Sequence, residues 1–180
     1  VPLYREENKY YIDESNLDNL VFLDNGTQFV ITSEKSGYMH LYLYDLNGRE
    51  RQAITKGNFD IIDFYGYDPV RKLFYYSSYE ESPLEKYIYS INEKGLKKKL
   101  TPVKGWNEAS FSKNFNYYIN VVSNTDTPPV TALYNAKGKQ VRVLEDNKAV
   151  KEAVKAYNLA KPEFIQIPAA DGKTMLNAWI

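Results

Sequence analysis

The chain has 180 residues, with 23 basic and 23 acidic side chains, one histidine, 17 tyrosines and no cysteine. A net charge of zero argues against a nucleic-acid partner and against a polybasic membrane anchor, because both need clustered Lys and Arg. The lack of cysteine excludes disulfides, thiolate metal sites and a cysteine nucleophile, and the single His40 excludes any site that needs two histidines. No apolar run reaches the roughly 18 residues that a membrane-spanning helix requires.

Short runs rich in Val, Ile, Tyr and Phe recur along most of the chain and predict β-strands. In chain order they are residues 29–32, 40–44, 52–55, 61–65, 73–76, 87–91, 98–100, 108–111, 117–122, 130–134 and 140–144. Asn47-Gly48, Lys94-Gly95 and Lys137-Gly138 lie between such runs and indicate tight turns. Regularly spaced short strands with these turns predict a mainly all-β fold.

The strands form a repeat. Phe29, Leu73 and Tyr117 each open a strand after a polar turn, and they are 44 residues apart in both steps. Each unit closes on a similar pair: Ile54-Thr55, Leu100-Thr101 and Leu144-Glu145. About four antiparallel strands per unit is typical of a β-propeller blade. A β-sandwich also has short strands, but its chain does not return to the same turn at a fixed period.

Three blades cannot close a ring, since closed propellers have about four to eight. Residues 1–146 are therefore predicted to form a partial propeller of about three blades. Asp146-Asn147 then predicts a helix start, and Ala149, Val150, Ala153, Val154 and Tyr157 form one apolar stripe. We expect a linker helix within 147–160 that ends near Asn158. Strands at 164–168 and 175–180 follow, joined by the turn at Asp171-Gly172.

Three stretches carry a family resemblance: residues 31–42, the blade end at 54–61, and Arg-Val-Leu-Glu-Asp-Asn-Lys-Ala at 142–149. With the linker helix and the hairpin in this order, the chain resembles the prolyl oligopeptidase family from about residue 10 to Ile180. Within that family it is most similar to the dipeptidyl peptidase IV branch. The resemblance implies that residues 161–180 are the truncated start of an α/β-hydrolase domain, which we expect to continue beyond Ile180.

The resemblance further implies a parent serine enzyme that removes N-terminal dipeptides, with proline preferred second, through a Ser–Asp–His triad. The nucleophile elbow Gly-x-Ser-x-Gly does not occur in this sequence. We therefore predict a non-catalytic propeller fragment that gates substrate access and supports the hydrolase domain, and we assign no catalytic, cofactor-binding or metal residue. The alternatives are a propeller-type scaffold that binds protein or glycan without enzyme activity, and a small closed β-sandwich recognition module.

Partners and compartment follow from the same resemblance. It implies peptide substrates bound through the full-length parent, possible homodimerisation of that parent, and a bacterial protein that is periplasmic or otherwise exported. No nucleic-acid partner and no membrane span are expected for this stretch.

Several polar residues suggest chemistry but have simpler interpretations. His40 lies in a predicted strand, which favours a structural role over a catalytic one. Glu80-Glu81 is predicted to be a pair of solvated loop carboxylates, because the paired glutamates of the family lie on an earlier blade. Asn25-Gly26-Thr27 fits a glycosylation acceptor and equally a tight turn. Lys97-Lys98-Lys99 is predicted to be a solvated strand face.

Aromatic and acidic groups complete the set of candidates. Tyr75, Tyr76, Tyr117 and Tyr118 could stack nucleic-acid bases, but no basic groove accompanies them, so blade packing is the better interpretation. Asp60, Asp63 and Asp68 lack the spacing of a calcium loop.

Overall fold

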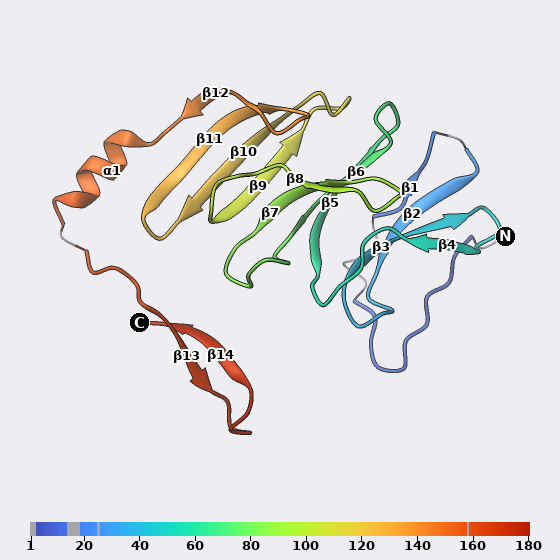
Figure 1. Ribbon diagram of the computed structural model, residues 1–180, viewed down its shortest axis with the longest axis horizontal. Helices are drawn as coiled ribbons and strands as arrows, with labels where there is room; N and C mark the ends of the chain where they lie inside the picture. Colours follow the sequence, from blue (N-terminus) through green and yellow to red (C-terminus); the bar gives the residue numbers. More distant parts are fainter. Residues whose placement is uncertain (1–2, 14–18, 25, 158) are drawn as a thin grey trace.

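The computed structural model describes residues 3–13, 19–24, 26–157 and 159–180 (Figure 1). It contains three four-stranded antiparallel sheets, in the orders β1-β2-β3-β4, β5-β6-β7-β8 and β9-β10-β11-β12. The first sheet consists of β1 (Val21–Phe22), β2 (Gln28–Ser33), β3 (His40–Asp45) and β4 (Glu50–Ala53). The second consists of β5 (Ile61–Asp68), β6 (Leu73–Ser78), β7 (Tyr87–Ile91) and β8 (Lys97–Lys99). The third consists of β9 (Trp106–Phe111), β10 (Tyr117–Asn124), β11 (Thr127–Asn135) and β12 (Gln140–Glu145).

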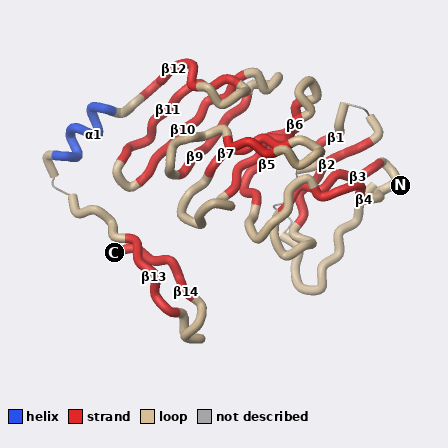
Figure 2. The backbone as a smooth tube through the Cα atoms, viewed as in Figure 1, coloured by secondary structure: helices blue, strands red, loops and turns tan. Residues whose placement is uncertain are grey.

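These consecutive sheets stand beside one another in an open arc (Figure 2). One core cluster joins the first sheet to the second, and includes Val30, Leu41, Phe74 and Tyr89. Another joins the second sheet to the third through Tyr75, Ile88, Tyr118 and Tyr134. The prediction of about three propeller-type blades is confirmed, and the sandwich alternative is wrong, because a sandwich packs two sheets only.

The repeat is not strictly periodic. The second strands of the three sheets begin at Gln28, Leu73 and Tyr117, which are 45 and 44 residues apart. Phe29 packs on the outer face of the first sheet, away from the second sheet. It therefore corresponds to Phe74, and the predicted equivalence of Phe29 with Leu73 is wrong by one residue. Because side chains alternate between the two faces, that single step exchanges one face for the other.

The turn between the third and fourth strands is built in the same way in every sheet. The side-chain oxygen of its first residue accepts hydrogen bonds from the backbone N–H groups two and four residues later, at 2.9–3.1 Å. The first residues are Asp45, Asn92 and Asn135. Each turn also holds a glycine with positive φ of 73–78°: Gly48, Gly95 and Gly138. The local chemistry of Asx turns therefore explains this part of the repeat.

A buried threonine extends the pairing beyond the fourth strand in two sheets. The Oγ1 atoms of Thr55 and Thr101 accept hydrogen bonds of 3.0 Å from the backbone N–H groups of Leu41 and Ile88. Strand β4 accordingly ends at Ala53, two residues before the predicted end at Thr55, because a side chain replaces the backbone partner there. The predicted strand at 98–100 is observed one residue earlier.

After β12 the chain forms α1 (Lys148–Lys155). Asn147 occupies the N-cap position in a left-handed conformation, but its side chain donates to the carbonyl oxygen of Pro129 at 2.6 Å and does not cap the helix. The backbone N–H of Lys148 instead donates to Asp146 Oδ1 at 3.0 Å. Asn158, where we expect the helix to end, lies outside the described residues. The apolar stripe is exposed, since no residue of α1 is buried.

A separate hairpin follows, formed by β13 (Phe164–Pro168) and β14 (Met175–Trp179). At its turn Asp171 Oδ1 accepts hydrogen bonds from the backbone N–H groups of Lys173 and Thr174 at 2.8 and 2.9 Å, as the turn signal predicts. The hydroxyl of Thr174 and these two N–H groups lower the pKa of Asp171 to about 2. No described helix is long and apolar enough to cross a membrane. The assignment of 161–180 to a hydrolase domain stays a prediction.

We expect Thr101→Val to lower the free energy of unfolding by about 1–3 kcal/mol, because the buried N–H of Ile88 loses its acceptor while the side-chain volume changes little. Urea denaturation of the purified chain measures this loss. Thr101→Ser keeps the hydroxyl, so its free energy of unfolding should remain closer to that of the unsubstituted chain. Equal losses for both substitutions would contradict the role assigned to the hydroxyl.

Candidate functional site

A cavity of about 670 Å³ lies where the second and third sheets meet the segment before β13. Its apolar lining includes Leu84, Trp106 and Phe164, and its polar lining includes Asp126 and Lys161. Lys161 Nζ lies 2.9 Å from Asp126 Oδ1, so an ion pair joins the segment after α1 to the turn between β10 and β11. The volume lies in the range of ligand pockets in proteins. This cavity is the candidate functional site.

Backbone pairing between two sheets holds Trp106 in this cavity. Lys86 and Trp106 form an isolated parallel bridge, in which the Lys86 N–H donates to the carbonyl oxygen of Gly105 at 3.1 Å. The N–H of Asn107 donates to the carbonyl oxygen of Lys86 at 3.0 Å. The residue on each side of Trp106 is therefore tied to Lys86, which fixes the backbone from which the indole projects.

The ammonium group of Lys86 contacts the indole ring of Trp106 and two carboxylates. Its ammonium lies 4.9 Å from the centre of the Trp106 ring, 3.2 Å from Asp63 Oδ2 and 3.7 Å from Glu108 Oε1. The indole N–H in turn donates to the same Glu108 oxygen at 3.3 Å. The Lys86 side chain is only 6% exposed, so its charge needs these partners. Ring, cation and carboxylates form one connected group, the Lys86 cluster.

The Lys86 cluster also sets the ionisation of Asp63. Burial by itself would raise the pKa of this carboxyl group, but the hydroxyl of Ser77, 2.7 Å away, and the Lys86 ammonium outweigh burial and lower the pKa. The phenol of Tyr65 donates to the same carboxylate at 3.3 Å. Asp63 is therefore held as a carboxylate, which keeps Lys86 neutralised.

A buried amide fixes the backbone under Trp106. Asn107 Nδ2 lies within 2.9–3.2 Å of the carbonyl oxygens of Lys86, Val103 and Gly105, and Asn107 Oδ1 accepts a hydrogen bond of 3.0 Å from Asn120. Both asparagines are buried. Asn120 Oδ1 has no partner among the described residues. These bonds give the carbonyl oxygen of Val103 a partner and add a second donor to the carbonyl oxygens of Lys86 and Gly105, which already accept backbone N–H groups.

His40 lies elsewhere, in β3. Its Nδ1 atom is 3.1 Å from Thr55 Oγ1 and its Nε2 atom is 3.0 Å from the carbonyl oxygen of Gly57. The imidazole packs edge-on against Phe59, with ring centres 5.2 Å apart. Neither polar partner is a carboxylate that could orient a catalytic base, so these contacts are those of a packed side chain.

The prediction that Glu80 and Glu81 are solvated is wrong for Glu80. Its side chain is 8% exposed, and Glu80 Oε2 lies 2.5 Å from the ammonium of Lys97. Glu81 Oε2 lies 2.8 Å from the ammonium of Lys99, and Oε1 accepts a hydrogen bond from Tyr89. The three lysines of β8 are exposed as predicted, but two of them neutralise this pair. The sequence does not indicate this pairing, because the loop with the two glutamates and strand β8 are far apart in the chain and meet only in the fold.

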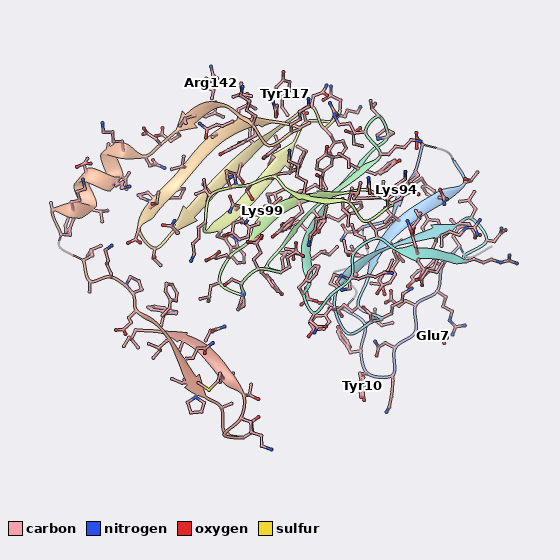
Figure 3. All side chains as sticks on the ribbon, viewed as in Figure 1. Glu7, Tyr10, Lys94, Lys99, Tyr117 and Arg142 are labelled. Carbon is pink, nitrogen blue, oxygen red and sulfur yellow. The ribbon has the colours of Figure 1, made fainter. Side chains whose placement is uncertain are left out.

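The tyrosine prediction is correct for the three buried residues Tyr75, Tyr76 and Tyr118, whereas Tyr117 is 49% exposed at the margin of the molecule (Figure 3). The acidic triplet is dispersed over different partners. Asp60 accepts from the N–H of Met39, and Asp68 pairs with Arg71 at 2.7 Å. No group of three or more potential metal ligands occurs among the described residues. Asn25 of the glycosylation signal lies outside the described part of the chain.

The residues that build the cavity were missed in the sequence. Lys86, Trp106 and Asn107, which form or support its wall, belong to no motif, and Lys86 meets the other two only when two sheets stack. Gly105 beside Trp106 was the one available signal. Its φ is +140°, and a Cβ atom there would lie 2.4 Å from the carbonyl oxygen of Ser123, which excludes any side chain.

Consecutive four-stranded antiparallel sheets arranged in an arc, with core clusters between neighbouring sheets, define a segment of a β-propeller. The chain belongs to the family described as the dipeptidyl peptidase IV (DPP IV) N-terminal region, whose model matches residues 1–129.

Known proteins similar to the chain agree with this assignment. A probable dipeptidyl peptidase 4 from Aspergillus flavus is 30% identical over 173 residues, which cover 88% of this chain and 22% of the relative. A dipeptidyl peptidase 4 from Trichophyton rubrum is also 30% identical, with 88% and 22% covered. The crystal structure of Porphyromonas gingivalis dipeptidyl peptidase 4 matches with a TM-score of 0.91 and 40% identity, over 98% of this chain and 25% of that one. The chain thus spans about a quarter or less of these proteins.

We expect Gly105→Ala to lower the free energy of unfolding by about 2–3 kcal/mol, because the new Cβ atom would meet a backbone carbonyl at a φ that L-residues avoid. Gly95→Ala is the matched control, since Gly95 has φ +78° but open space around it, and its cost should be about 1 kcal/mol. Thermal and urea unfolding compare the two variants. Equal losses would contradict the steric argument.

We expect Lys86→Met to raise the pKa of Asp63, because burial then acts without the neighbouring positive charge. In the unsubstituted chain this pKa is lowered, so the stability that Asp63 contributes is present above its unfolded pKa of about 3.9 and is lost as the pH falls through the folded value. Carboxyl chemical shifts followed by NMR during an acid titration measure the change. Lys104→Met removes an exposed charge as the control and should leave the pKa of Asp63 in place.

Proposed function

We propose that this chain is a non-catalytic propeller section of a serine-type dipeptidyl peptidase. In this role it would form one wall of the substrate chamber and support the hydrolase domain that the hairpin β13–β14 would begin. The observation that carries the proposal is the match to the dipeptidyl peptidase IV N-terminal region over residues 1–129, together with a cavity at the edge of the arc that faces the hairpin.

Gating is the physical function that such a wall can perform. A chamber lined by rigid sheets admits a slender peptide terminus and excludes a folded protein by size. It also separates the reacting groups from bulk water, which strengthens electrostatic interactions inside. The chain's own residues would act by shape and contact, because its sequence carries no Gly-x-Ser-x-Gly elbow.

The parent enzyme would release N-terminal dipeptides, with proline preferred at the second position. Its export to the periplasm or cell surface and its assembly as a homodimer are part of the same proposal. The support for these points is the resemblance of the whole chain to enzymes of this type.

The test uses the full-length parent with a Gly-Pro chromogenic substrate. We expect hydrolysis that is abolished when the serine of the parent's own nucleophile elbow is replaced by alanine. His40→Gln should keep the turnover number, because His40 is a packed residue in β3. The purified chain of 180 residues should show no hydrolysis.

Two results would contradict the proposal. Hydrolysis by the 180-residue chain alone would show that it carries catalytic groups. A full-length parent without any peptidase activity would favour the scaffold that binds protein or glycan.

A further inference from the structure

We propose that Trp106 is a substrate-contacting platform in the chamber wall, and that it binds the leaving portion of the peptide, beyond the N-terminal dipeptide. Lys86, Asp63 and Glu108 act as positioning residues that hold the platform. This inference rests on the proposed function and names the part of the substrate that the propeller section contacts.

The first argument is that the indole is pre-organised. Its backbone is paired to Lys86, its N–H is bound by Glu108, and the Lys86 ammonium lies 4.9 Å from the ring centre. Trp106 nevertheless stays 42% exposed and lines the cavity. A large apolar side chain that is fixed in orientation and open to a pocket loses little conformational entropy when it binds a ligand. Such residues are typical anchors of recognition sites.

The second argument is the chemistry of the cavity around the indole. Leu84, Pro162 and Phe164 supply apolar surface beside Trp106. The charges at the cavity are paired within the chain, as Lys104 with Glu85 and Lys161 with Asp126, both at 2.9 Å. An apolar pocket whose charges are already neutralised suits a polypeptide segment of mixed sequence better than a strongly charged small molecule.

The third argument is position. The ion pair of Lys161 with Asp126 joins the segment before β13 to the turn between β10 and β11, and both residues line the cavity together with Phe164 at the start of β13. The hairpin lies below the arc on this side (Figure 1). If the hairpin begins the catalytic domain, this cavity lies at the junction between the propeller section and that domain. In the proposed enzyme the N-terminal dipeptide is held at the catalytic centre, so we assign the remaining peptide to Trp106.

The experiment measures kcat/KM of the full-length parent on two substrates: a Gly-Pro chromogenic dipeptide and a peptide of about ten residues that begins with Gly-Pro. We expect Trp106→Ala to lower kcat/KM for the long peptide about tenfold more than for the dipeptide, mainly through KM, because the lost contact is to the leaving portion. Trp106→Phe should keep most of the kcat/KM for the long peptide that Trp106→Ala loses. Lys86→Met should produce a smaller effect in the same direction, because it loosens the ring without removing it.

Tyr10→Ala is the matched control, since Tyr10 is an exposed aromatic residue on the N-terminal segment, away from the hairpin (Figure 3). It should leave both rates unchanged. Equal losses on the two substrates after Trp106→Ala, or no loss on either, would overturn the inference and would indicate a contact between domains. A parent that cleaves neither substrate before substitution would instead refute the proposed function, so the two failures are distinguishable.

Discussion

Each sheet of this chain has apolar side chains on both faces, so each needs a neighbouring sheet on either side. The third residue of the second strand illustrates this constraint: Val30 and Tyr75 are fully buried, whereas the equivalent Ile119 on the third sheet is 39% exposed. The outer face of the first sheet is covered in part by Leu3 and Tyr4. Burial of both faces drives the stacking into an arc, because the apolar area removed from water is the main favourable term.

Packing of the second sheet against the third buries polar and charged groups at their junction. The Asn107 side chain donates to the carbonyl oxygens of Lys86, Val103 and Gly105, and so reinforces the backbone pairing of Lys86 with Gly105 and Asn107. The same arrangement buries Lys86, whose charge then needs Asp63. The hydrogen bonds that hold the buried backbone and the ion pair that neutralises the buried charge therefore also orient Trp106.

The candidate site shows why a search for motifs finds catalytic machinery more readily than it finds a binding surface. A nucleophile elbow is a local pattern that strand, turn and helix impose together. A binding surface needs only shape, apolar area and paired charges, and many sequences provide these. Glu80 shows the same limit in a simpler case, because nothing next to it in the sequence indicates that Lys97 will cover it. The family resemblance of the whole chain was therefore more informative about function than any single residue.

Most strands, the Asx turns, the threonines after the fourth strands and the hairpin at Asp171-Gly172 could be predicted from the sequence, since each depends on hydrogen bonds between residues close in the chain or within one repeat. The repeat predicted from the sequence is one residue out of register in the first sheet, because the alternation of side chains along a strand does not say which face packs against the neighbouring sheet. The contacts of Lys86 with Asp63, Trp106 and Glu108 could not be predicted from the sequence and are visible in the fold alone. These residues come from different sheets, and the stacking that joins them is set by packing over the whole interface.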